Sequence, residues 1–119
     1  MIRVYVAGLY GHTNTGIIGN LNNMREGMRA SLEVLLKGYA PFVPWFDYHF
    51  QLMLRDKENL TVEDYYNYSL AWLEVSDVLF VISNHDKSVG VNREIEKAKE
   101  LGIPIVYSIK ELEELECVS

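Results

Sequence analysis

Residues 77–94 read DVLFVISNHDKSVGVNRE. In this stretch an apolar segment is followed by a polar segment and then by the start of a segment with helical spacing. Asp77–Ile82 predicts a buried strand, because Val-Leu-Phe-Val-Ile follows the aspartate without interruption. Ser83–Lys87 predicts a polar loop. Val89–Leu101 has a helical pattern, and Gly102 follows it as a C-cap glycine would. A buried strand that leads through a loop into a helix is typical of an α/β protein.

The same alternation extends in both directions along the chain. Apolar runs predict strands at 3–8, 41–44 and 103–107, and helical patterns cover 20–37, 46–55, 61–74 and 110–115. Gly38 ends the first helix, and Thr61 with Asp64 forms a variant of the capping box. Near-continuous apolar strands separated by helices predict a parallel sheet covered on both faces. We expect one three-layer α/β/α domain over 1–119, Rossmann- or flavodoxin-like, with a parallel sheet of four to five strands.

Composition narrows the classes of protein that fit. Of the 119 residues, 49% are hydrophobic, and the single cysteine, Cys117, favours a reducing compartment. No apolar run has membrane-spanning length and no secretory signal precedes the first strand, so we expect a cytoplasmic protein without a membrane partner. His12, His49 and His85 lie far apart in the sequence, which predicts no metal site, and we expect no cofactor.

The net charge of −6 argues against a polymeric nucleic acid as partner. It is compatible with a small nucleoside or nucleotide, because backbone N–H groups at a helix start can bind a lone phosphate. In parallel α/β sheets such ligands bind outside the carboxyl ends of the strands. That rule selects four segments: 8–19, 45–47, 83–90 and 107–108.

Within the third of these segments, Ser88 and Gly90 lie where an anion would meet free backbone N–H groups at the start of a helix. Glu94 follows one turn later, near enough to reach the same cavity. The alternative, which the spacing alone favours, is that Ser88 is an N-cap and Glu94 a surface glutamate near the helix dipole.

The segment after the first strand, Leu9–Gly19, is rich in Gly, Thr and Asn and predicts a loop, although it is neither a Walker motif nor GxGxxG. Gly8 and Gly11 are candidates to make room for a ligand. Tyr10 and His12 are candidate contacts, with a solvated loop histidine as the favoured alternative for His12.

Trp45 and Asp47 follow the second strand. The tryptophan could stack on a base, and Asp47 is either a site carboxylate or a helix N-cap. Tyr5 is a core tyrosine unless its hydroxyl reaches the cleft. Asp77, at the amino end of its strand, is expected to be structural.

A cluster of aromatic residues follows helical spacing within 61–74. This spacing favours packing or a subunit interface over ligand binding. The cluster comprises Tyr65, Tyr66, Tyr68 and Trp72.

Four motifs in this order resemble the nucleoside 2-deoxyribosyltransferase superfamily. They are Tyr5-Val6-Ala7-Gly8, Ala71-Trp72-Leu73 before Ser76-Asp77-Val78, Ser88-x-Gly90-x3-Glu94, and Leu101-Gly102-Ile103-Pro104-Ile105. The likeness spans nearly the whole chain and is nearest to the 2′-deoxynucleoside 5′-monophosphate N-hydrolases and small uncharacterised relatives. The most specific motif is the serine-glycine-glutamate segment.

The resemblance implies that Glu94 is a nucleophile that attacks C1′ of the sugar and expels the base. It implies that Ser88 and Gly90 bind the 5′-phosphate, that Tyr5 lies close to the nucleophile, and that the protein is a homodimer or higher oligomer whose subunits complete each other's sites. The chain departs from the family at Ser69, where the hydrolases carry an aspartate. Asp47 and Asp64 are the candidates to replace that carboxylate.

These features predict an N-glycosidase or deoxyribosyltransferase acting on a nucleoside or nucleoside 5′-monophosphate, with Glu94, Asp47 and Tyr5 as catalytic residues. The alternative is a non-catalytic nucleotide-binding or sequestering module, which Ser69 favours. A pure interaction domain would need neither Glu94 nor the Ser88 loop in a pocket.

Overall fold

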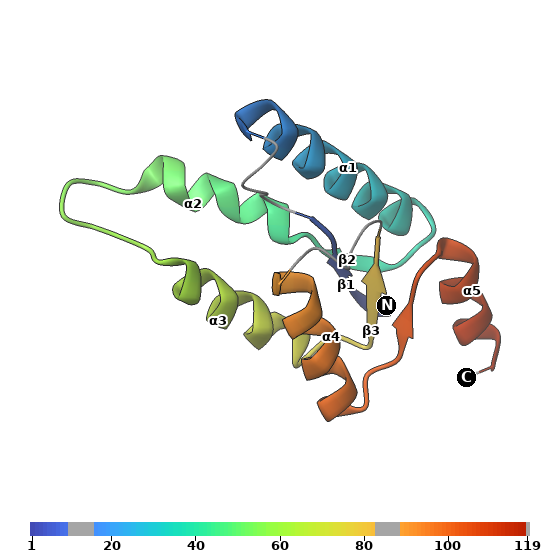
Figure 1. The fold of residues 1–119 in the computed structure, drawn as a ribbon. Helices are drawn as coiled ribbons and strands as arrows, with labels where there is room; N and C mark the ends of the chain where they lie inside the picture. The colour runs from blue at the N-terminus through green and yellow to red at the C-terminus, as the bar shows by residue number, and fades with distance from the viewer. Residues whose placement is uncertain (10–15, 83–88, 119) are drawn as a thin grey trace.

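The structure is a computed structural model that describes residues 1–9, 16–82 and 89–118. Four parallel strands form one sheet in the order β2-β1-β3-β4. The strands are β1 (Arg3–Ala7), β2 (Ala40–Phe42), β3 (Val78–Val81) and β4 (Ile105–Val106). The predicted three-layer α/β/α fold with a parallel, Rossmann-like sheet is confirmed (Figure 1).

Five α-helices and one 3₁₀ helix, η1, accompany the sheet within the described residues. They are α1 (Gly16–Leu36), η1 (Pro44–Asp47), α2 (Tyr48–Met53), α3 (Val62–Leu73), α4 (Val89–Leu101) and α5 (Ile109–Val118). None of them is long and apolar enough to cross a bilayer.

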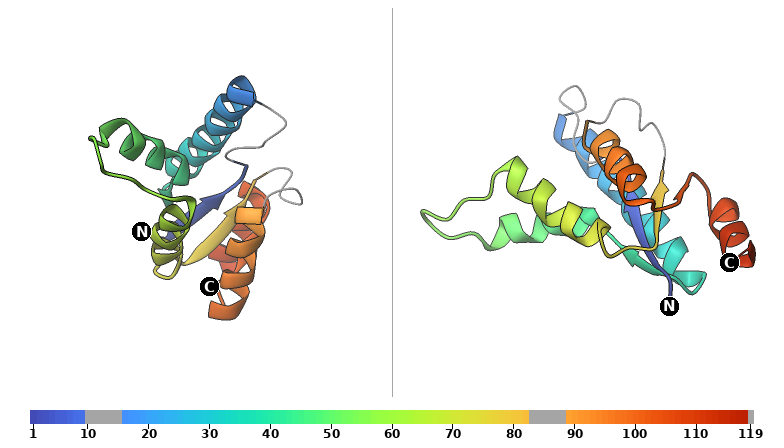
Figure 2. Two further views of the ribbon diagram at one scale, coloured as in Figure 1. Left: turned by 60° about the vertical axis from the view of Figure 1, so that its left-hand side comes forward. Right: turned by 90° about the horizontal axis from the view of Figure 1, so that it is seen from below.

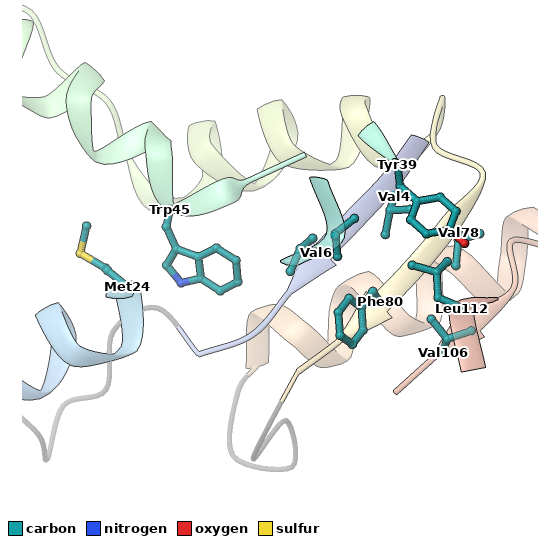
Figure 3. Close-up of a cluster of buried hydrophobic side chains, with 10 residues drawn as sticks. Val4, Val6, Met24, Tyr39, Trp45, Val78, Phe80, Val106 and Leu112 are labelled. Carbon is teal, nitrogen blue, oxygen red and sulfur yellow. The ribbon is translucent and has the colours of Figure 1, made fainter. Parts of the chain in front are cut away.

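Side chains alternate between the two faces of the sheet, and each face has its own buried cluster. Val4 and Val6 of β1 belong to one cluster with Met24 of α1, Phe80 of β3 and Leu112 of α5, all labelled in Figure 3. Tyr5 and Ala7 point to the opposite face, which α3 and α4 cover through Leu73, Val91, Ile95 and Ala98. Tyr5 is therefore fixed on the face that α3 and α4 cover.

Several boundaries differ from the sequence-based expectation. Helix α1 begins at Gly16, so the prediction of a loop through Gly19 was wrong at its end. The low helix propensity of glycine and asparagine is a weak preference that an established helix overrides. Strand β2 ends at Phe42 because Pro44, which has no N–H for a strand ladder, starts η1.

Two helices project from the body of the molecule. Residues 48–68, which we call the arm, comprise α2, the connection 54–61 and the first part of α3, and they extend away from the sheet in Figures 1 and 2. The molecule measures 50 × 26 × 25 Å. The expected capping box starts α3, with Thr61 and Asp64 bonded reciprocally.

Candidate active site

A cavity of about 500 Å³ lies at the carboxyl end of β1, between η1, the arm and the start of α4. Ala7 and Gly8 form its floor, and Ser69 and Glu94 lie on its inner side. The arm contributes Tyr48, Gln51, Tyr65 and Tyr66. A cavity therefore exists at the edge of the sheet where α/β proteins generally bind their ligands.

Glu94 lines this cavity from the second turn of α4. Its Oε2 atom is buried and has no hydrogen-bond partner among the described residues. Burial raises the pKa of this carboxyl from 4.5 to about 8, and the nearby Tyr5 hydroxyl opposes part of that rise. A buried polar oxygen without a partner is rare, and at a cavity wall it is a candidate ligand contact.

Tyr5 of β1 is completely buried and lies beside Glu94 and Ser69, directly behind the residues that line the cavity. Its hydroxyl has no hydrogen-bond partner among the described residues. Burial raises the pKa of Tyr5 well above 10, the charge of nearby Glu94 raises it further, and the Ser69 hydroxyl opposes the rise. Tyr5, Ser69 and Glu94 thus converge from three elements, and we call them the inner wall.

Of the two carboxylates considered as replacements for the family aspartate, only Asp47 lines the cavity. It stands at the N-cap position of α2, but its side chain makes no capping hydrogen bond. Its charge raises the pKa values of Tyr5 and Tyr65, on either side of the cavity. Asp64 is exposed and accepts hydrogen bonds from the Thr61 backbone N–H and hydroxyl, so the expectation that it reaches the cleft was wrong.

The sequence matches one known family over nearly its whole length. The model of a family described as a domain of unknown function, DUF7768, matches residues 3–108. The chain belongs to this family. No curated protein matches it.

A solved structure of the 2-deoxyribosyltransferase from the psychrotolerant bacterium Bacillus psychrosaccharolyticus is similar in fold. The TM-score is 0.60 and the sequence identity 18%, and the match covers 87% of this chain and 69% of that one. The DUF7768 chain therefore shares the fold of that enzyme.

Trp45 of the DUF7768 chain is only 1% exposed, and its edge borders the cavity. Its indole packs on Gly27, where an added methyl group would overlap the ring, and its Nε1 donates to the Leu9 carbonyl at 3.0 Å. Trp45 is thus a fixed wall of the cavity, and contact with a ligand stays a prediction.

The two predicted site glycines in the described region are needed by the protein's own packing. A methyl group at Gly8 would lie 2.5 Å from Ile82 Cγ1, and one at Gly90 would lie 3.0 Å from the Tyr66 hydroxyl oxygen. Both glycines line the cavity, but the space beside their Cα atoms is already filled. Tyr10, Gly11, His12 and Ser88 lie outside the described residues.

The sequence analysis missed Tyr65 and Tyr66, which line the cavity although we expected packing or an interface. Tyr68 and Trp72 point elsewhere and pack on Phe42, with centroid distances of 6.1 and 5.8 Å. Tyr65, Tyr66 and Ser69 share one side of α3, but helical spacing alone does not show which side of a helix faces a cavity.

The predicted segment 107–108 does not line the cavity. The Ser108 hydroxyl accepts a hydrogen bond from the Glu111 N–H, and the Glu111 carboxylate accepts one from the Tyr107 N–H, so the segment caps α5. Asp77 is structural as expected, since its carboxylate accepts from the Arg3 N–H at 2.8 Å. Within the described residues, no group of three or more His, Cys, Asp or Glu side chains could hold a metal ion.

Proposed function

We propose that this protein is an N-glycosidase or deoxyribosyltransferase that cleaves the glycosidic bond of a nucleoside or nucleoside 5′-monophosphate. The observation that carries the proposal is the Glu94 carboxylate, whose buried oxygen lacks a partner in a cavity beside the Tyr5 hydroxyl. A fold shared with a 2-deoxyribosyltransferase supports the same chemistry.

In this mechanism the ionised Glu94 carboxylate attacks C1′, a C–O ester bond forms, and the C–N bond electrons leave with the base. Water, or a second base in a transferase, then displaces the glutamate from C1′. A carboxylate suits both steps because it stabilises an oxocarbenium-like centre and is also a competent leaving group. Asp47 is the proposed acid that protonates the departing base, a contribution of about 10²–10⁴-fold.

The raised pKa of Glu94 has a consequence for turnover. With a pKa of about 8, most of the unliganded protein holds Glu94 protonated at neutral pH. Because the ionised form is the nucleophile, we expect kcat/KM to rise with pH and to level off above that pKa.

Ser69 supports a second candidate, a nucleotide-binding or sequestering module without turnover. This residue is 7% exposed and lines the cavity beside Tyr5, where the hydrolases carry an aspartate. A hydroxyl cannot supply the charge or proton of a carboxyl group, so binding without cleavage is the expected result if Asp47 does not act in its place.

The proposal also includes the oligomeric state, the extent of the domain, the location and the cofactor requirement. The arm exposes Phe50, Met53 and Tyr68, and we propose that a second copy of the chain covers them in a homodimer or higher oligomer. We propose residues 1–119 as one functional domain, a cytoplasmic location and no cofactor.

The test is a panel of deoxynucleosides and their 5′-monophosphates, assayed for free base with and without a second base as acceptor. We expect Glu94→Gln to lower turnover by on the order of 10⁴-fold or more. Glu96→Gln is the matched control, because Glu96 lies exposed on the same helix. Base release that survives in Glu94→Gln would refute the nucleophile, and tight binding with intact ligand recovered would favour the second candidate.

A further inference from the structure

Tyr66 closes one end of the cavity. It projects from α3 toward the start of α4, where its hydroxyl oxygen and Cε1 are the atoms nearest to a methyl group placed on Gly90, at 3.0 Å each. Helices α3 and α4 lie side by side in Figure 1, and the Tyr66 ring reaches from α3 to Gly90 of α4. Any substituent that extends along α4 past Glu94 therefore meets the phenol.

The ring is held from outside the cavity. The Arg93 guanidinium lies over it, 4.2 Å from the ring centroid. Arg93 in turn donates to both carboxylate oxygens of Glu63, at 3.0 and 3.3 Å, and this pair joins α4 to α3. A stacked cation and a two-point ion pair restrict the rotation of the phenol more than a single contact would.

The position of Tyr66 relative to Glu94 determines which part of a bound substrate Tyr66 restricts. Gly90 precedes Glu94 by one helical turn, about 5–6 Å along α4. In the proposed function Glu94 faces C1′ and Asp47 faces the base. We place the sugar's 5′ end beside Gly90 and Tyr66, which line the same cavity one helical turn from Glu94. Arg93 lies three residues after Gly90 on α4, and its guanidinium is paired with Glu63.

We infer that Tyr66, clamped by Arg93 and Glu63 against Gly90, restricts the 5′ end of the substrate, so that the site prefers a nucleoside with a free 5′-hydroxyl over a 5′-monophosphate. This inference rests on the proposed function. A 5′-hydroxyl is small enough to pair with the phenol oxygen, whereas a phosphate would have to displace the ring from Gly90.

The experiment compares a 2′-deoxynucleoside with its 5′-monophosphate, by rate of base release and by dissociation constant. We expect the wild type to favour the nucleoside by about tenfold or more in kcat/KM, the range that a pocket's fit to one group provides. Tyr66→Ala should reduce this preference to near unity, Arg93→Gln should reduce it partly, and Tyr66→Phe should retain it because the ring remains.

Lys97→Gln is the matched control, since Lys97 also pairs α4 with α3, through Glu74 at 3.9 Å, away from Tyr66. It should leave the preference unchanged, and melting temperatures identify variants that lose their fold. A wild type that prefers the monophosphate, or an unchanged preference in folded Tyr66→Ala, would overturn the inference while leaving the proposed function intact.

Absence of base release from both compounds would instead refute the proposed function. In that case only the dissociation constants test the inference about Tyr66. Tighter binding of the nucleoside that is lost in Tyr66→Ala supports it, and equal binding or no binding overturns it.

Discussion

The inner wall, Tyr5, Ser69 and Glu94, stands on three elements that each contribute residues to one buried cluster, among them Ala7, Leu73 and Ile95. The arm borders the cavity with Tyr48 and Gln51 from a helix that has no buried residue. A group that reacts must be held accurately by packed neighbours, whereas a group that admits and recognises a ligand must tolerate movement. The contrast therefore assigns chemistry to the inner wall and recognition to the arm.

The largest expected effect comes from comparing the two tryptophans, because one is packed in the body of the molecule and the other is exposed. Trp45 is 1% exposed and borders the cavity from the packed body of the molecule, whereas Trp72 is 48% exposed on α3, just past the arm. We expect Trp45→Ala to lower the free energy of unfolding by about 3–5 kcal/mol, because it leaves a cavity over Gly27. Trp72→Ala loses mainly its stacking on Phe42 and should cost about 1 kcal/mol. Urea unfolding monitored by circular dichroism gives both values, and equal losses would contradict the contrast.

The second prediction uses the proton on Glu94. Because burial raises its folded-state pKa from 4.5 to about 8, the folded protein keeps a proton that the unfolded chain has released between these pH values. The free energy of unfolding should therefore fall as pH rises through this window, by roughly 1.4 kcal/mol per pH unit. Glu94→Gln stays neutral and should lose this dependence, so that it becomes more stable than the wild type toward pH 8.

Urea unfolding at several pH values measures that dependence, with Glu96→Gln as the exposed control on the same helix. Parallel pH profiles for the wild type and Glu94→Gln would show that the carboxyl is not buried in the way described.

The fold could be predicted because its evidence is local. Uninterrupted apolar runs such as Val78–Val81 and the glycines at 38 and 102 mark elements without reference to distant residues, and both glycines adopt positive φ as helix ends require. Features that depend on a contact between distant residues could not be predicted. Gly27 must be glycine because Trp45 lies on it, and no local pattern connects these two positions.

The site was predictable only in part, for the same reason. The rule that ligands bind at the carboxyl edge of the sheet selected the segments that hold Asp47 and precede Glu94, but spacing alone favoured a surface glutamate at 94, and the family resemblance pointed to the site; both residues line the cavity. Asp64, the other candidate, does not line the cavity, because its carboxylate accepts hydrogen bonds from Thr61 in the predicted capping box. Tyr65 and Tyr66 were missed because the spacing of an aromatic cluster does not show which side of the helix faces a hollow.

A third prediction concerns the hydrogen bond that joins the two helices of the arm. The Tyr65 hydroxyl donates to Gln51 Oε1 at 2.7 Å and so joins α3 to α2. Tyr65→Phe should cost about 1 kcal/mol or less, since both groups are partly exposed and water can replace the bond. We expect the loss to appear as faster hydrogen exchange in α2 while β1 and β3 stay protected. Tyr68→Phe, on another side of the same helix, is the control, and slower or unchanged exchange in α2 would contradict the role of Tyr65.

The smallest effect is expected at the tip of the arm. Lys57 has φ 71°, the left-handed region that side chains disfavour, within a turn in which the Arg55 N–H donates to the Glu58 carboxylate at 2.7 Å. Lys57→Gly removes a steric cost of about 1–2 kcal/mol but increases the freedom of the unfolded chain, so we expect a net gain of only about 0.5 kcal/mol. Lys57→Asn, which tolerates this conformation and keeps a side chain, should gain a similar amount. If the arm opens independently of the sheet, this gain slows hydrogen exchange in α2 and leaves the midpoint of urea unfolding unchanged. A higher urea midpoint would instead show that the arm and the inner wall unfold together.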